Sequence, residues 1–197
     1  MRVPSRRFLI TAILFAPVLL SAPVTSDRQA QLHMASGIEQ YQKGNLAGAI
    51  ADLKRALLAA PQDSQLHFML GNALYRSGEW LKAADEYGAA LALNPLNLEA
   101  RISRGFSLFE AGRLEKAVAE WRAAVQVNSS EPFARAALSA GLSAAGEMLE
   151  AKRQFAIAVL LDPRYADPDL LRIDIRWTRN ALDALKSNLG IKSNTSR

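Results

Sequence analysis

The chain has 197 residues, of which 50% are hydrophobic and 22% are charged, so it is long enough to bury the core of one domain. It contains no cysteine, which excludes disulfide bonds, thiolate metal sites and a cysteine nucleophile. The formal net charge is +5, but three arginines lie in an N-terminal segment without acids, and the remainder has 21 basic against 19 acidic residues and no basic stripe, which argues against nucleic-acid binding.

Residues 1–26 differ in composition from the rest of the chain. Arginines at positions 2, 6 and 7 precede an apolar run over residues 8–20, and small residues follow it. This order is typical of a secretory signal peptide, and we expect cleavage after Ser26 because Pro23 disfavours an earlier site. The apolar run is shorter than the ~20 residues of a membrane-spanning helix. An uncleaved N-terminal anchor is the alternative, and it is the only contact with a membrane that the sequence suggests.

The export route has two interpretations. Residues 5–10, Ser-Arg-Arg-Phe-Leu-Ile, resemble a twin-arginine export motif, although Thr11 stands where lysine is common. A general secretory signal with adjacent arginines is the other interpretation. Both predict an exported protein, located in a bacterial periplasm, with a thylakoid lumen or a membrane-anchored form as alternatives.

The rest of the chain repeats with a period of 34 residues. One glycine, two alanines and one bulky apolar residue recur at fixed offsets: Gly44, Gly78, Gly112 and Gly146; Ala49, Ala83, Ala117 and Ala151; Ala56, Ala90, Ala124 and Ala158; Leu53, Tyr87, Trp121 and Phe155. The apolar spacing around each glycine is helical. Residues 27–165 are therefore predicted to form four units of two helices each, over 30–63, 64–97, 98–131 and 132–165, with glycine in the turn between the helices.

These residue columns resemble the tetratricopeptide repeat. The resemblance is carried by Leu70, Gly71, Tyr75, Gly78, Ala83, Tyr87, Ala90 and Pro95, and again by Gly105, Leu108, Gly112, Ala117, Trp121 and Ala124. It implies an all-α fold, a right-handed α-solenoid of four helix-turn-helix repeats. The first and last units depart from the usual Leu-Gly pair, with Ser36-Gly37 and Ser139, as terminal repeats commonly do.

A further helix is predicted over residues 166–190, followed by a disordered tail over 191–197. Asp167 suits an N-cap, and Gly190 is placed to end the helix. We expect this helix to cap the last unit, because solenoids must cover their terminal apolar face. A second apolar strip is the reason to consider a partner contact or a fold back onto the protein as well; it comprises Leu170, Ile173, Trp177, Ala181 and Ala184.

No catalytic constellation and no cofactor-binding motif is found, so the sequence predicts a protein that is not an enzyme. His33 and His67 occupy equivalent positions of consecutive units, but Arg101 and Arg135 continue their column and no third ligand is evident. A metal site is therefore not predicted. This column is expected to cover apolar surface with its polar tips in water, or to form an edge that favours anions as the histidines become charged.

The candidate functional site is one face of the first helix of each unit. Three positions per unit lie beside those that pack on the second helix, and in the family this face lines a concave groove. We expect packing between units to occupy about half of these residues and the others to form an apolar groove for a peptide or helix. The predicted partner-binding residues are Met34, Ile38, Tyr41, Phe68, Asn72, Tyr75, Ile102, Phe106 and Phe109.

The last unit carries only Ala136, Ala140 and Ser143 on this face, which leaves room for the C-terminal helix or a ligand. Some family members use lysine, asparagine and arginine here to hold the C-terminal carboxylate of chaperones. In this chain Phe68, Glu99 and Ser103 stand at such places, so the resemblance does not extend to chaperone tails.

The sequence thus predicts a non-catalytic module that binds a protein or peptide partner in the cell envelope, as an assembly or scaffold factor, without nucleic acid or a small-molecule cofactor. Two alternatives stay open. One is a self-associating structural protein, in which the C-terminal helix of one copy lies in the groove of another. The other is a noncatalytic subunit of an exported enzyme complex.

Overall fold

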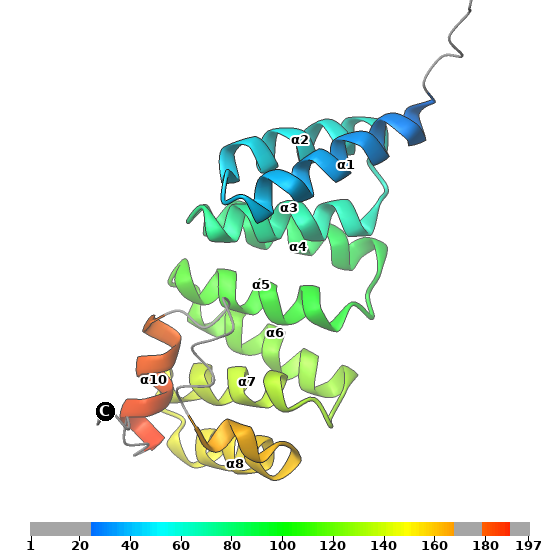
Figure 1. Cartoon of the computed structure of the whole chain (residues 1–197). Coiled ribbons are helices and arrows are strands. Elements are labelled where there is room, and N and C mark those ends of the chain that lie inside the picture. The colour runs from blue at the N-terminus through cyan, green and yellow to red at the C-terminus, as the bar shows by residue number, and fades with distance from the viewer. Residues whose placement is uncertain (1–24, 168–178, 190–197) are drawn as a thin grey trace, which may run out of the picture.

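The computed structural model of the protein describes residues 25–167 and 179–189 (Figure 1). These residues form α-helices and one short 3-10 helix, and no strand occurs among them. The bounds are α1 (Ser26–Gln42), α2 (Leu46–Ala59), α3 (Ser64–Arg76), α4 (Trp80–Leu93), α5 (Leu98–Glu110), α6 (Leu114–Val127), α7 (Pro132–Ala144), α8 (Met148–Leu161), η1 (Pro163–Ala166) and α10 (Arg179–Leu189). The predicted all-α solenoid of helix pairs is confirmed.

Each pair is joined by the tight turn that the glycine period predicts. The four turn glycines have φ between 70° and 82°, a conformation that other residues adopt only with strain. In the first turn the Gly44 amide donates to the Tyr41 carbonyl at 3.1 Å, and the Asn45 amide donates to the Gln40 carbonyl at 2.9 Å. The same two bonds recur in the other three turns. They satisfy carbonyls at the end of the first helix and turn the chain back along it.

The pairs pack in chain order, which places α1, α3, α5 and α7 in one layer and α2, α4, α6 and α8 in the other. Contacts between α3 and α5 and between α5 and α7 link neighbours within the first layer. Side-chain caps begin the first helices: Asp63 accepts from the amides of Gln65 and Leu66, and Asn97 accepts from the Ala100 amide. The surface of the first layer is called the first-helix face below.

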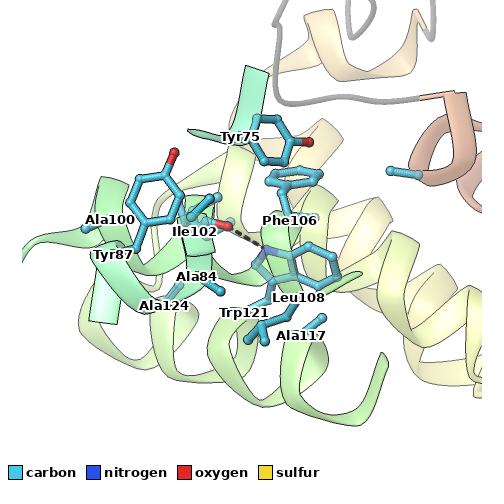
Figure 2. Close-up of a cluster of buried hydrophobic side chains, with 14 of the residues drawn as sticks. Tyr75, Ala84, Tyr87, Ala100, Ile102, Phe106, Leu108, Ala117, Trp121 and Ala124 are labelled. Atoms are coloured by element: carbon cyan, nitrogen blue, oxygen red, sulfur yellow. Dashed lines mark hydrogen bonds between the residues drawn. The ribbon is translucent and has the colours of Figure 1, made fainter. Parts of the chain in front are cut away.

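Small and large side chains interlock between the helices of a pair. Trp121 of α6 is completely buried, and its Nε1 donates to the carbonyl of Ile102 on α5 at 3.1 Å (Figure 2). A Cβ at Gly105 would lie 2.3 Å from that nitrogen, so only glycine allows the indole to approach α5 this closely. Tyr87 packs on Gly71 in the same way. A second set of glycines, distinct from those of the turns, thus faces the bulky column of the repeat: Gly37 lies against Leu53, Gly71 against Tyr87 and Gly105 against Trp121.

Several predictions concern residues outside the described ranges. The signal segment lies there except for its last residues, as do Leu170, Ile173 and Trp177 of the expected C-terminal helix and the tail beyond residue 190. Helix α1 begins at Ser26, four residues before the first unit was expected to start. Among the helices within 25–167 and 179–189, none combines the length and the hydropathy required to cross a bilayer.

Candidate functional site

The three sites that the sequence predicts in the first unit share one side of α1. Met34, Ile38 and Tyr41 are spaced by four and three residues, and each is partly exposed. Asn72 on α3 is also partly exposed, and the Arg76 guanidinium lies 4.6 Å from the centre of the Tyr41 ring. We call this surface the N-terminal patch. It combines aliphatic and aromatic groups with a cation held over a ring, which suits an apolar ligand with polar flanks.

A hollow of about 280 Å³ adjoins this patch between the start of α1 and the loop that joins α2 to α3. Its lining includes Met34, Gln31 and Leu66 together with the carboxylates of Asp27 and Asp63. Met34 and Tyr41 also pack against the core, whereas Ile38 does not belong to that cluster. Ile38 is therefore the side chain of the patch that depends least on the core.

The predicted site residues farther along the chain are mostly buried. Phe68 and Tyr75 keep only 8% and 7% of their surface exposed, Ile102 keeps 3%, and Phe106 keeps none. The Phe106 ring lies 5.1 Å from Trp121 and 5.8 Å from Phe133, centre to centre. Phe106 was expected to line the groove; it belongs to the core instead, because Trp121 of its own unit and Phe133 of the next unit pack against it. Phe109 is partly exposed.

Asn72 has a structural task that its position in the sequence did not reveal. Its Oδ1 accepts a hydrogen bond of 2.6 Å from the hydroxyl of Tyr87 on α4. That bond satisfies a phenol which is otherwise enclosed in the core. The amide nitrogen of Asn72 can still donate to a ligand.

Sequence reasoning missed a second apolar surface at the turn between α3 and α4. Trp80 and Leu81 are 37% and 51% exposed, and they line a hollow of about 530 Å³ with Gly78, Glu110 and Ala111. The signal was a departure from the repeat, because the other units carry Leu46, Leu114 and Met148 at the position of Trp80. An exposed tryptophan beside an open hollow is a typical protein-contact residue.

The column of histidines and arginines forms polar bridges within each unit. His67 lies 2.7 Å from Glu86, Arg101 donates to Glu120 at 3.4 Å, and Arg135 donates to Gln154 at 2.6 Å. Each of these three side chains also contacts a carbonyl of the preceding loop, and His33 faces Asp52 at 3.9 Å. The polar tips of the column contact second-helix groups, mostly carboxylates, as well as water, and the His33 side chain keeps 40% of its surface exposed. The neighbouring carboxylates argue against the expected anion-favouring edge.

The carboxyl of Asp52, which faces His33, has a lowered pKa. The Ser36 hydroxyl donates to Asp52 Oδ2 at 2.6 Å and, with Arg55 and His33 nearby, holds the pKa of that carboxyl below its ordinary value of 3.8. Within the described residues, no group of three or more histidine, aspartate or glutamate side chains is arranged to hold a metal ion.

We expect Ser36→Ala to lower the free energy of unfolding by about 1–2 kcal/mol at pH 7, because it removes a hydrogen bond to a charged, largely buried carboxylate. A lowered folded-state pKa stabilises the protein fully above the ordinary value, and this contribution is lost as the pH falls through the folded-state pKa. The difference between variant and wild type should therefore narrow below about pH 3.8. Urea unfolding at pH 7 and at pH 2.5 measures it; a pH-independent difference would contradict the assignment.

The small residues of the fourth unit are covered. Ala136 and Ala140 have no exposed surface and Ser143 keeps 3%. Helix α10 packs against α7 and, to a smaller extent, against α8. The C-terminal helix therefore folds back onto the first-helix face of the last unit, as one of the sequence interpretations allowed.

Comparison with known proteins agrees with this architecture. The tetratricopeptide repeat family model matches residues 34–97 and 68–132, which together span half of the chain. No curated protein sequence matches the chain. Similar solved structures include MamA 41-end from Desulfovibrio magneticus RS-1, with 19% identity, a TM-score of 0.66, and coverage of 83% of this chain and 94% of that chain.

Two further structures resemble the chain at the level of the fold. YrrB, described as a TPR protein with an unusual peptide-binding site, is 21% identical with a TM-score of 0.63, covering 84% of this chain and 88% of that chain. The first TPR of Spaghetti (RPAP3), bound to the HSP90 peptide SRMEEVD, is 20% identical with a TM-score of 0.59, covering 63% of this chain and 98% of that chain.

Proposed function

Because the chain belongs to the tetratricopeptide repeat family, we propose that it is a non-catalytic protein-binding module whose N-terminal patch receives an apolar peptide or helix of an exported partner. The observation that carries this proposal is the partly exposed trio of Met34, Ile38 and Tyr41 beside Asn72 and Arg76. An assembly or scaffold role fits a surface that offers contact area and no reactive groups.

The chemistry of the first-helix face favours an apolar ligand over an acidic chaperone tail. The Spaghetti repeat holds an acidic peptide, SRMEEVD. In this chain Phe68 and Ser103 are buried, and Glu99 is exposed, at the places where carboxylate-holding members of the family have bases or amides. The exposed carboxylate would repel such a tail, and these places offer no basic pair to hold it.

The proposed location is the periplasm, with export directed by residues 1–26. The arginines at positions 6 and 7 and the apolar run over 8–20 support it. Residues 1–26 fused to a reporter that functions only when exported in a folded state should give signal if the twin-arginine route is used. No signal there, but signal from a reporter that folds after export, would indicate the general secretory route.

We expect Ile38→Glu to reduce capture of partner proteins from envelope extract at least about tenfold, because a charge placed in an apolar contact is left without a partner. The measurement is quantitative mass spectrometry after pull-down with the full chain. Leu58→Glu is the matched control, since Leu58 is 86% exposed on α2 and lies in the other helix layer. Proteins that Ile38→Glu fails to capture and Leu58→Glu still captures would support binding at the N-terminal patch. Equal capture by the two variants would contradict it.

A further inference from the structure

The docked helix α10 makes a small, specific contact with the fourth unit. Ala181, Leu182 and Leu185 are buried, and they share one side of the helix because they are spaced by one and three residues. Arg179, Asn180 and Asp183 are exposed. Asn180 Nδ2 donates to Glu110 Oε2 of α5 at 3.1 Å, so α10 is fixed to two first helices (Figure 1).

The surface beneath α10 is built to accept a helix. On the first-helix face the fourth unit carries the smallest side chains of any unit, those of Ala136, Ala140 and Ser143. The corresponding positions of the third unit hold Ile102, Phe106 and Phe109. Small side chains let a helix axis come close, and two leucines then fill the space beside them. Helix α7 is also held by α6 and α8, so its place does not depend on α10 alone.

Helix α10 is held weakly by comparison with the helices around it. It has 11 residues, fewer than the number at which an isolated helix becomes stable in water. Ala181, Leu182 and Leu185 are the residues buried among those whose side chains are described at 179–186, whereas ten residues of α7 are buried. The helical state of α10 therefore depends on docking, and release of α10 leaves the other helix contacts of the fourth unit in place.

We infer that α10 is a displaceable occupant of the first-helix face: it closes the fourth unit to a partner helix that carries the same contact pattern. This inference rests on the proposed protein-binding function and extends it from the N-terminal patch to the fourth unit. The partner segment is a short amphipathic helix with alanine, leucine and, three residues later, leucine on one side, and an amide donor that reaches Glu110.

Tethering makes α10 an effective competitor even though its contact is small. A segment joined to its own site acts at an effective concentration in the millimolar range, so a free helix must exceed that level or bind more tightly. The occupied state is therefore the resting state, and a partner that also contacts the N-terminal patch gains the additional affinity that displacement requires.

A peptide with the sequence of residues 179–189, labelled with a fluorophore, serves as the probe. We expect it to bind the full-chain variant Leu182→Asp/Leu185→Asp at least about tenfold more tightly than the wild type, because charged residues release the internal competitor. The control is Leu149→Asp/Leu160→Asp, since both leucines are more than 80% exposed on α8. This control should bind the peptide as weakly as the wild type.

The binding site is located by two further measurements. Ala140→Leu, added to the released variant, should reduce peptide affinity toward the wild-type level by filling the surface beneath α10. A photo-crosslinker at the peptide position that corresponds to Lys186 should attach to the fourth unit, at α7 or α8, which keeps the test valid if Ala140→Leu impairs folding. Equal peptide affinity for the released variant and the wild type, or crosslinks elsewhere, would overturn the inference. Such a failure leaves the Ile38 result, and with it the proposed function, untouched.

Discussion

Replacing Trp121 by alanine should lower the free energy of unfolding by about 3–5 kcal/mol, the largest effect that we expect from a single substitution in this chain. The indole is fully buried between α5, α6 and α7, and its ring packs 5.1 Å from Phe106 and 5.9 Å from Phe109. Truncation removes this apolar contact, opens a cavity and leaves the Ile102 carbonyl without its 3.1 Å donor. Urea unfolding followed by circular dichroism measures the change.

A double-mutant cycle with Gly105 tests the interlocking directly. Gly105→Ala alone should destabilise the protein, because its Cβ would lie 2.3 Å from Trp121 Nε1. In the Trp121→Ala background the same methyl group enters the cavity, and an alanine suits a helix better than glycine, so the substitution should become neutral or stabilising. Equal effects in both backgrounds would show that the indole does not press on α5.

Gly105 and Trp121 each belong to a set of positions that recurs every 34 residues, so the repeat period indicates that the same two positions are equivalent in each unit. The exposure of Phe106 could not be predicted in the same way. Its position is equivalent to Ile38 and Asn72, which are partly exposed, but its burial depends on Trp121 of its own pair and on Phe133 of the next unit. A helical pattern identifies a side of a helix; it does not identify the neighbour that covers it.

The place of α10 was open for a related reason. Its apolar spacing predicted a buried side, and the small residues of α7 left room for this helix or for a ligand, but neither pattern decides which of the two occupies the space. The polar bridges, by contrast, have a clear signal in the sequence. Each member of the His33 column stands 19 residues before Asp52 or its equivalent, so a carboxylate or amide recurs with the same period. Matching the two periods would have predicted the pairing.

In the third unit one carboxylate, that of Glu120, pairs with two arginines. Glu120→Ala should therefore cause the second largest loss in the free energy of unfolding. Glu120 accepts from Arg104 at 2.8 Å and from Arg101 at 3.4 Å, and its side chain is only 16% exposed. Alanine would leave the guanidinium groups of two partly buried arginine side chains, 20% and 35% exposed, without their carboxylate, since no other acid pairs with them in the described part of the chain. We expect the free energy of unfolding to fall by about 2–3 kcal/mol, below the range for fully buried pairs because both arginines keep some solvent.

The fourth unit supplies the matched control for that experiment. There Arg135 donates to Gln154 at 2.6 Å, so an amide oxygen can take the place of the carboxylate in this geometry. Glu120→Gln should consequently retain a hydrogen-bond acceptor and lose clearly less stability than Glu120→Ala in the same urea titration. If the two variants lose equal stability, the bridge acts through charge alone. If neither loses any, the column is a surface feature and the repeat is held by its apolar contacts.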